Sequence, residues 1–385
     1  MDTETIMKYF DYAATCPLDR EAAEIYIQTG TEHFGNSQSL HDMGSTAENI
    51  LEVCRREFSN LLDVECAGIF FTSGGSESNY LTIIALLSAL RKKGKHIITG
   101  AAEHSSVYNL MKKLETEGWE VTYLPLNRRG QIEYDSVIKA ARKETVLVSI
   151  HHGNPEIGTL QPLEAIAAFC KSQDVLLHSD CVQTFGKIPI ASIAGSVDAL
   201  SISGHKFYGP KGTGAAYINP RLAWKPLIAG TTHEKGFRPG TVNIPGIAAM
   251  TTAAQKAHLI METETVRLRK LRSLFRETLS DRTDRVQIFG DDEAFQIPGI
   301  LGMSIKGIEG QYVMLECNRK GYAISTGTAC HTGMVSPAKT MTAMGITGKE
   351  AKEFFRISFG RETKAEDVEA LAKTIAELSL HASAF

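Results

Sequence analysis

Short runs of β-branched and other apolar residues alternate with longer helical patterns between residues 68 and 218, and this alternation limits the fold more than any other feature. Strands separated by helices form βαβ units, which build a mainly parallel sheet. In such sheets, ligands bind beyond the carboxyl ends of the strands. The sequence predicts strands at residues 68–72, 96–99, 121–124, 146–150, 175–178, 199–203 and 214–218, with helices at 76–91, 107–117, 134–141 and 163–172.

The pattern changes after Asn243. Residues 247–279 form one long helical pattern, which predicts a single helix or two broken ones. Further on, the sequence predicts strands at 286–289, 302–305, 323–325 and 355–358 and helices at 311–320 and 365–378. We therefore expect a large domain of residues 15–260 and a smaller α+β domain of residues 1–14 and 261–385.

Charge and hydropathy exclude several classes of function. Lys and Arg number 41 against 44 Asp and Glu, so the chain has no overall basic surface for nucleic acid. The most apolar stretch, residues 80–90, is well short of the ~20 residues that span a membrane, and the first ten residues lack the apolar region of a secretory signal. The seven cysteines include no Cys-x-x-Cys pair, which argues against zinc and favours reduced thiols. We expect a cytoplasmic protein without a metal site.

The loop after the first predicted strand reads Ser73-Gly74-Gly75-Ser76 and leads into a helix. Small residues before a helix leave backbone N–H groups exposed at the positive end of the helix dipole, an arrangement that binds phosphate. No Gly-Lys-[Ser/Thr] follows, so this is not a Walker loop. The alternative is an ordinary strand-to-helix turn with a serine cap.

Three more polar side chains follow predicted strands. His104 is able to stack on a flat ligand, act as an acid or base, or have no role. Asp180 is costly at a buried strand end unless a cation pairs with it, and the alternative is a helix-capping Asp. Lys206 suits Schiff-base formation if burial lowers its pKa, and the alternative is a solvated turn lysine. Together with the phosphate-type loop, these groups are the set that pyridoxal phosphate (PLP) requires.

These residues, with their neighbours, resemble the cysteine desulfurases of the NifS/IscS-like group, in the class V aminotransferase superfamily of fold-type I PLP enzymes. That resemblance implies an α/β fold, with a large domain built on a mainly parallel seven-stranded sheet plus the smaller α+β domain, and a homodimer. The matching stretches cover nearly the whole chain in family order: residues 9–15, 71–79, 103–107, 156–162, 179–184, 201–214, 238–243, 325–330 and 355–361.

The resemblance implies how PLP would be bound. Lys206 would hold the cofactor as a Schiff base, and Asp180 would pair with the pyridine nitrogen. His104 would stack on the ring and act in catalysis by shuttling protons. Gln183 would hydrogen-bond the phenolic oxygen. The phosphate would be held by four residues of the same chain, Gly75, Ser76, Ser203 and His205. Thr241 would reach the phosphate from the second subunit of a dimer.

The resemblance also implies the reaction. L-cysteine would be converted to L-alanine, and Cys330 would accept the sulfur as a persulfide and pass it to an acceptor protein in iron–sulfur cluster assembly, tRNA thiolation or a dedicated pathway. Arg356 would clamp the substrate carboxylate, with help from Asn36. Residues 326–339 contain two Gly and one Pro among several Ser and Thr, a composition typical of a mobile loop, which a sulfur carrier needs.

Two stretches depart from the family pattern. Pro155 replaces an Asn that helps to hold the phenolic oxygen, and proline has neither a side-chain amide nor an N–H. Asn154 or a histidine would have to take over, or Gln183 would act alone. Asn36 is followed by Ser-Gln where the family has Pro-Ser, and the adjacent His151 and His152 are interpreted as local packing.

Pro155 keeps a second hypothesis open, that the chain is a catalytically weakened homologue acting as a sulfur-relay or scaffold partner. A selenocysteine lyase, an aminotransferase or another PLP lyase on the same scaffold is a further alternative. Cys330 in its glycine-containing stretch argues against a plain transaminase, which needs no thiol.

Overall fold

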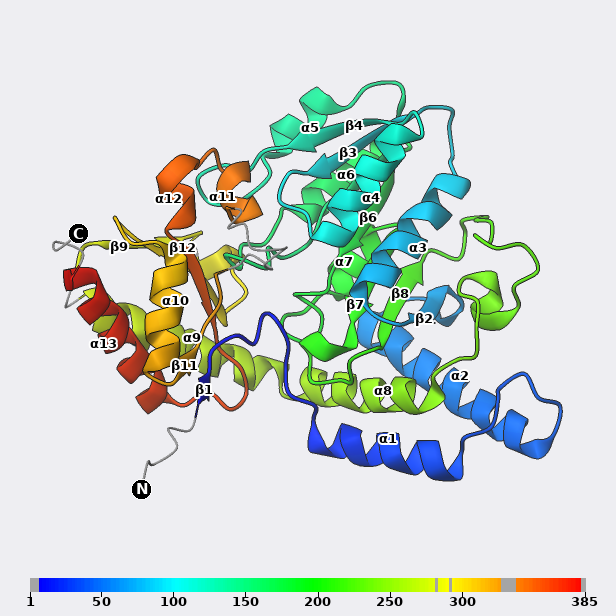
Figure 1. Cartoon of the computed structure of the whole chain (residues 1–385). Coiled ribbons are helices and arrows are strands. Elements are labelled where there is room, and N and C mark those ends of the chain that lie inside the picture. The colour runs from blue at the N-terminus through cyan, green and yellow to red at the C-terminus, as the bar shows by residue number, and fades with distance from the viewer. Residues whose placement is uncertain (1–6, 281–282, 291–292, 327–336, 382–385) are drawn as a thin grey trace.

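The computed structural model describes residues 7–280, 283–290, 293–326 and 337–381. A seven-stranded sheet forms its centre, with the strand order β2-β8-β7-β6-β5-β3-β4 (Figure 1). β8 runs antiparallel to both of its neighbours, and the other pairs are parallel. The predicted strands are thereby confirmed, as β2 (Ile69–Thr72), β3 (His96–Gly100), β4 (Glu120–Leu124), β5 (Thr145–Ser149), β6 (Leu176–Asp180), β7 (Ala199–Ser203) and β8 (Gly214–Ile218).

Helices cover both faces of this sheet, which explains why its central strands are buried throughout. Neighbouring residues of one strand point to opposite faces, so Leu176 packs in one core cluster and Leu177 in another. One face carries α3 (Gly75–Ser88) and α4 (Ser105–Thr116). The other face is covered by a larger group, α2 (Asp42–Leu62), α6 (Leu163–Ser172), α7 (Ala191–Ser196) and α8 (Ile244–Leu259). A short helix, α5 (Tyr134–Ala140), precedes β5.

Two helices lie ahead of the large sheet in the sequence and were not among the predicted elements. α1 (Arg20–Glu32) begins after Asp19, whose carboxylate accepts the backbone N–H groups of Glu21 and Ala22. α1 packs on α8, and α2 packs on α8 beside it. The two helices extend the large sheet's layers on the side away from the small sheet (Figure 1).

The predicted helix over 247–279 is two helices. α8 ends at Leu259 and α9 (Met261–Ser280) begins two residues later. Figure 1 shows α9 leaving the large sheet and entering the second part of the molecule, so the break lies where the chain passes from one core to the other.

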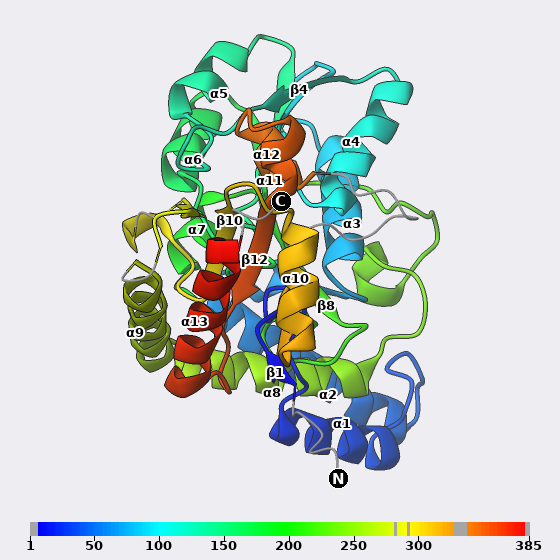
Figure 2. The ribbon, with the colours of Figure 1, turned by 60° about the vertical axis from the view of Figure 1, so that its left-hand side comes forward.

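That second part contains a three-stranded antiparallel sheet in the order β12-β10-β9. Its strands are β9 (Val286–Phe289), β10 (Ile300–Ile305) and β12 (Phe354–Ser358), and its helices are α9, α10 (Gly310–Arg319) and α13 (Ala365–His381) (Figure 2). Two short helices, α11 (Lys339–Ala343) and α12 (Gly348–Lys352), lie toward the large sheet. The predicted strand at 323–325 lies one residue earlier, as β11 (Tyr322–Ala323).

The N-terminal segment belongs to this second part. β1 (Lys8–Tyr9) pairs in parallel with β11, and Phe10 is buried in the core of the small sheet. The chain then crosses to the large sheet, where the Cys16 N–H donates to the carbonyl of His205. The predicted domain limits, 15–260 for the large domain and 1–14 with 261–385 for the small one, stay a prediction. In the described part of the chain, no helix combines the length and the hydrophobicity needed to span a bilayer.

Candidate active site

Lys206 lies just beyond the end of β7, in a single turn of 3₁₀ helix (Gly204–Lys206). Its Nζ donates to the carbonyl oxygens of Ala13 and Ala14, both at 2.7 Å, so the crossing N-terminal segment holds it. Burial, together with the positive charges of Lys187 and Arg356, lowers the pKa of Lys206 to about 7. An amine with this pKa is substantially neutral at neutral pH, which is the form that attacks an aldehyde.

Asp180 ends β6, the strand next to β7, and is 6% exposed. Its Oδ2 accepts from the side-chain amide of Asn79 at 2.7 Å and its Oδ1 from the backbone N–H of Val182 at 2.9 Å. The amide of Asn79, on α3, also donates to the hydroxyl of Ser106. These bonds hold the carboxylate at the carboxyl end of the sheet, where the sequence predicts the pyridine partner.

His104 caps the first turn of α4. Its Nδ1 lies 2.8 Å from the Ser106 hydroxyl and accepts the Ser106 N–H. A continuous chain of hydrogen bonds therefore runs from His104 through Ser106 and Asn79 to Asp180. The pKa of His104 is lowered, mainly because surrounding atoms displace water from the ring.

The predicted phosphate loop forms the N-terminus of α3. Gly74 has a φ of +149°, a backbone conformation that side chains rarely adopt. A Cβ on Gly75 would lie 2.8 Å from a methyl of Val182 and 3.2 Å from the Cβ of Ser203. A side chain at this position would therefore collide with its neighbours, and glycine avoids the collision. The loop thus places Gly75, the first residue of α3, against Ser203 at the end of β7, and Ser76 follows in the same turn.

The other predicted phosphate ligands are more scattered. The ring of His205 contacts the hydroxyl of Thr15 at 3.1 Å, and burial lowers its pKa to about 4, so this ring is a neutral donor or acceptor at pH 7. Thr241 is exposed after Gly240 and lies on the surface of the chain.

Arg356, on β12, reaches the site from the small sheet. It is 6% exposed, and its guanidinium donates to Asp11 Oδ1 at 2.6 Å and to the Pro155 carbonyl at 2.8 Å. Its Nε is buried, and no described residue forms a hydrogen bond with it. A buried guanidinium with a spare donor suits a carboxylate ligand.

Asn36 does not lie beside Arg356 within this chain. It is exposed in the loop between α1 and α2, where its side chain accepts from the Gln38 N–H at 3.0 Å. Figure 1 shows this loop at the far end of the large part from β12.

Cys330 lies outside the described residues. The described residues on either side of 327–336 contact Arg356 and the helix that begins after His104. Ser325 forms two backbone hydrogen bonds with Arg356, at 3.0 and 2.6 Å. On the other side, the Lys339 ammonium lies 4.6 Å from the ring centre of Tyr108, one turn after His104.

Asn154 is one of the residues expected to replace the asparagine that is missing at Pro155. The Asn154 amide donates to Thr340 at 2.9 Å, and its oxygen accepts the backbone N–H groups of Glu156 and Ile157. Asn154 is fully buried and is occupied by these structural contacts. These contacts, to Thr340 and to the backbone of the following turn, fix the orientation of the Asn154 amide.

The two adjacent histidines also have separate partners. His151 contacts Glu103 at 2.9 Å through both its backbone N–H and its Nδ1, whereas the Nδ1 of His152 contacts the Thr184 hydroxyl at 3.1 Å. Burial lowers the pKa of His152 to about 4. In His151, burial acts in the same direction, but the Glu103 carboxylate outweighs it and the pKa is raised. Among the described residues, no cluster of three or more His, Cys, Asp or Glu could hold a metal.

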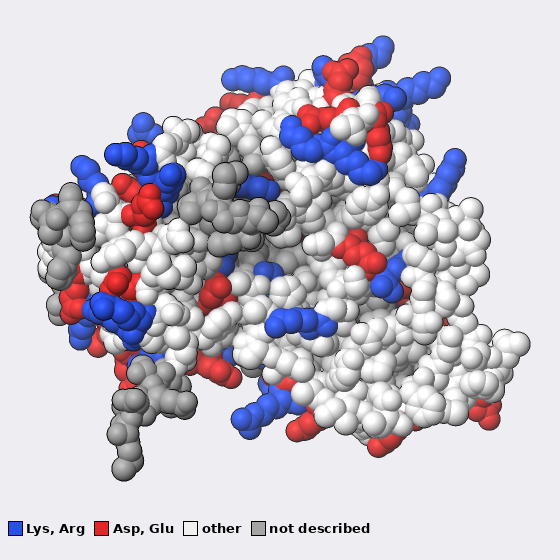
Figure 3. Space-filling view, viewed as in Figure 1, with Lys and Arg blue, Asp and Glu red and all other residues white. Residues whose placement is uncertain are grey.

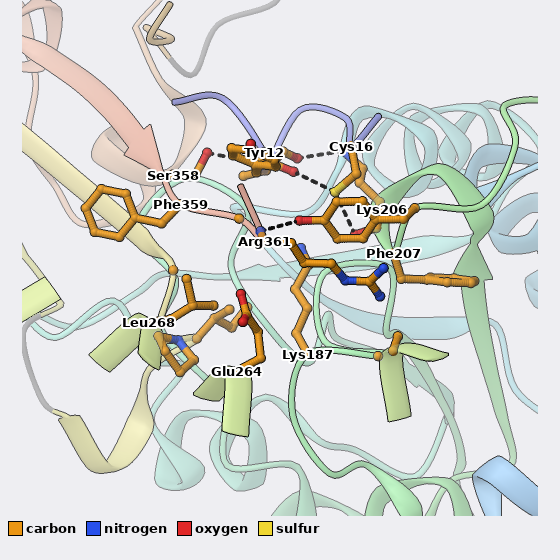
Figure 4. A pocket seen from close by; sticks show the side chains of 18 of the residues that line it. Tyr12, Cys16, Lys187, Lys206, Phe207, Glu264, Leu268, Ser358, Phe359 and Arg361 are labelled. Atoms are coloured by element: carbon orange, nitrogen blue, oxygen red, sulfur yellow. Dashed lines mark hydrogen bonds between the residues drawn. The ribbon is translucent and has the colours of Figure 1, made fainter. Parts of the chain in front are cut away.

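Several contributors were not among the predicted site residues. Lys187, Cys16 and Tyr12 line one pocket with Lys206, and residues of the small sheet close its other side (Figure 4). Lys187 donates to Gln183 Oε1 at 2.9 Å. Its spacing of four residues from Gln183 was a signal in the sequence, since such a spacing brings two side chains together in a helical turn.

The site and the fold define the class of the protein. A buried low-pKa amine, a buried carboxylate and a glycine-lined helix N-terminus on neighbouring strand ends fit the amine, pyridine and phosphate contacts of PLP. The family model described as "Aminotransferase class-V" matches residues 8–371. This is therefore an enzyme of the PLP-dependent class V aminotransferase type.

Known relatives narrow the class. A "Putative cysteine desulfurase NifS" of Bacillus subtilis (strain 168) is 47% identical over 97% of this chain and 94% of its own. A "Cysteine desulfurase IscS" of Dictyoglomus turgidum is 39% identical over 94% of this chain and 91% of its own. A solved structure titled "NIFS-LIKE PROTEIN" superposes with a TM-score of 0.89 at 32% identity, covering 97% of this chain and 99% of the other. The chain belongs to the cysteine desulfurase family of the NifS and IscS type.

Proposed function

We propose that this chain removes sulfur from L-cysteine, leaving L-alanine, and carries the sulfur as a persulfide on Cys330 to an acceptor protein. The observation that carries the proposal is the buried Lys206 amine, whose pKa is lowered to about 7, at a strand end beside Asp180. The names of the full-length relatives agree with this reaction. Free cysteine is the substrate because the site offers a carboxylate-binding Arg356.

Bound PLP supplies an electron sink for the bond changes at the substrate. Lys206 would hold it, Asp180 would pair with the pyridine nitrogen, and Gln183 would hydrogen-bond the phenolic oxygen. His104 would stack on the ring, and its lowered pKa favours the neutral imidazole, which is able to accept a proton. The phosphate would be held by Gly75, Ser76, Ser203, His205 and, across a dimer, Thr241.

At the substrate end, the Arg356 guanidinium binds the carboxylate of cysteine. This guanidinium pairs with Asp11, and its Nε has no partner among residues 7–280, 283–290, 293–326 and 337–381, which leaves a donor for a carboxylate ligand. Asn36 lies far from Arg356 of its own chain, so it would assist only from the second subunit of the dimer proposed below. The Cys330 thiolate would then attack the substrate sulfur, so that the S–S bond of the persulfide forms as the C–S bond breaks. The carbon fragment keeps the electron pair of the C–S bond and takes up a proton, which gives alanine.

We further propose a homodimer. Exposed apolar side chains gather on α1, on the loop after it and on the segment before α8, among them Tyr26, Ile27, Phe34, Leu40, Leu227 and Ile228. Figure 3 shows the corresponding lobe almost without charged side chains. The two loops contact each other, since the Gln38 amide donates to the Thr232 hydroxyl at 2.9 Å. A face of this kind is typical of a subunit interface, and exposed Thr241 lies on the same segment.

The acceptor stays open between iron–sulfur cluster assembly, tRNA thiolation and a dedicated client. We place the enzyme in the cytoplasm, since a persulfide carrier needs a reducing compartment and all the described cysteines are free thiols. Pro155 favours one competing hypothesis, a weakened homologue that relays or scaffolds sulfur without releasing alanine.

The test is alanine formation from L-cysteine with a thiol reductant, measured beside the visible spectrum of the purified protein. Alanine and sulfide in equal amounts, with a cofactor band, are expected. Lys206→Ala serves as the control and should lose the cofactor band as well as the formation of alanine and sulfide. A cofactor band without alanine or sulfide would replace the proposal with the relay hypothesis, and alanine with selenide from selenocysteine alone would replace it with a selenocysteine lyase.

A further inference from the structure

Lys187 is a lysine without a role in the reaction described above, and its contacts fix another side chain. Its Nζ lies 2.9 Å from Gln183 Oε1. An ammonium group has three donors and no acceptor, so the Gln183 amide must turn its oxygen toward Lys187. On its other side, Gln183 Nε2 lies 2.9 Å from the carbonyl of Ala13, which only accepts. Both neighbours therefore select the same orientation of the amide.

The same carbonyl holds the central amine. Ala13 O accepts from Lys206 Nζ at 2.7 Å as well as from Gln183. A continuous chain of hydrogen bonds thus joins Lys187, Gln183, Ala13 and Lys206. Lys187 and Lys206 also line one pocket (Figure 4).

We propose that Lys187 is a positioning residue of the cofactor site: it fixes the Gln183 amide with its nitrogen directed toward the phenolic oxygen of PLP and adds a positive charge beside Lys206. The proposal rests on the roles proposed above for Gln183 and Lys206. The nitrogen of Gln183 carries two hydrogens, and the Ala13 carbonyl takes one, so the second serves the cofactor. Pro155 has no side-chain amide, and the Asn154 amide is directed toward Thr340.

The charge effect has a defined direction. Lys187 and Arg356 lower the pKa of Lys206, and Cys16 and Asp11 raise it, with burial as the largest cause of lowering. Burial also lowers the pKa of Lys187, to about 8, with Arg356 lowering and Cys16 raising it. Below that pH Lys187 is mainly protonated, so it destabilises the charged form of Lys206 and favours the neutral amine.

The first experiment measures Lys206 without cofactor. The apoprotein is labelled with acetic anhydride over a range of pH, and the fraction of Lys206 acetylated is read by peptide mass spectrometry. Lys187→Met should raise the pKa of Lys206 by about one unit, because a like charge is removed. Lys187→Arg should leave it near the wild-type value. Lys171→Met, which removes an exposed charge on α6, should leave it unchanged.

The second experiment measures the Gln183 amide through bound PLP. Lys187→Met should shift the visible band of the bound cofactor or the pH at which it titrates, whereas in a Gln183→Ala background the same change should shift the band position no further. Lys187→Gln, which keeps a donor without the charge, should retain the band position but raise the pKa of Lys206. If Lys187→Met does not fold, Lys187→Gln replaces it in the labelling experiment, where the loss of charge alone is tested.

The proposal is overturned if the variants without the charge label Lys206 as the wild type does, or if Lys187→Met shifts the band equally with and without Gln183. A wild-type protein that binds PLP and forms alanine, together with either of these results, would refute only the role of Lys187. A wild-type protein that binds PLP without forming alanine would instead refute the proposed function and leave both Lys187 measurements interpretable.

Discussion

The pair Arg55–Glu234 allows a prediction whose magnitude follows from the structure. Arg55, on α2, is 2% exposed at its side chain and Glu234 is 1% exposed. Two guanidinium nitrogens lie 2.9 and 3.0 Å from the Glu234 oxygens, and one of them also donates to the Ile69 carbonyl at 2.5 Å. Glu234 Oε2 further accepts the Phe71 N–H at 2.7 Å. The pair thus joins α2, the edge strand β2 and the segment that leads to Thr241.

Arg55→Met should lower the free energy of unfolding by about 3–5 kcal/mol, because it leaves the Glu234 carboxylate buried with one remaining donor. Glu234→Met should cost a similar amount. The double variant Arg55→Met/Glu234→Met should cost clearly less than the sum of the two, since neither charge is then left unpaired. Glu52→Gln is the matched control: Glu52 binds the same guanidinium at 2.9 Å, but its side chain is 36% exposed. Loss of that pair should cost about 0–1 kcal/mol.

The assay is equilibrium unfolding in urea, with the midpoint and slope fitted for each variant. The midpoint should fall in the single Met variants and recover in part in the double variant, with the slope unchanged. A single Met variant that loses less than about 1 kcal/mol, or a double variant that loses the full sum, would refute the account of a desolvated and mutually dependent pair.

Three further predictions concern the reaction. Cys330→Ala should keep the visible band of bound PLP and lose sulfide release from cysteine, because cofactor binding does not need the thiol; sulfide release at the wild-type rate would remove Cys330 from the mechanism. Arg356→Gln should raise the KM for cysteine about 10- to 100-fold, the equivalent of a charged hydrogen bond of about 1.5–3 kcal/mol, and an unchanged KM would place the carboxylate clamp elsewhere. The rate at which the apoprotein takes up PLP should rise as the pH increases through about 7, the lowered pKa of Lys206, and then level off; a rise that continues to about pH 10 would assign an ordinary lysine pKa to that amine.

Much of the large sheet could be predicted because its strands have a local signature. Each is a short apolar run bounded by polar or glycine-containing turns, and all lie within the described residues close to the predicted limits. The α2 helix was missed although Leu51, Cys54, Phe58 and Leu62 follow a helical spacing and are buried. Its buried positions also include Arg55, whose charge is costly to bury unless an opposite charge pairs with it. That partner, Glu234, lies 179 residues further along the chain.

The sequence by itself determined the order of strands and helices, the residues at the strand ends and the kinship with cysteine desulfurases, because these depend on neighbouring residues along the chain. Only the tertiary structure decided which distant groups share the site. Lys206 lies 193 residues from Ala13, and Arg356 lies 345 residues from Asp11, yet each pair forms a hydrogen bond. The tertiary structure also decided the pKa of Lys187 and the orientation of the Gln183 amide. Both depend on the charges and carbonyl groups that folding brings around a buried group.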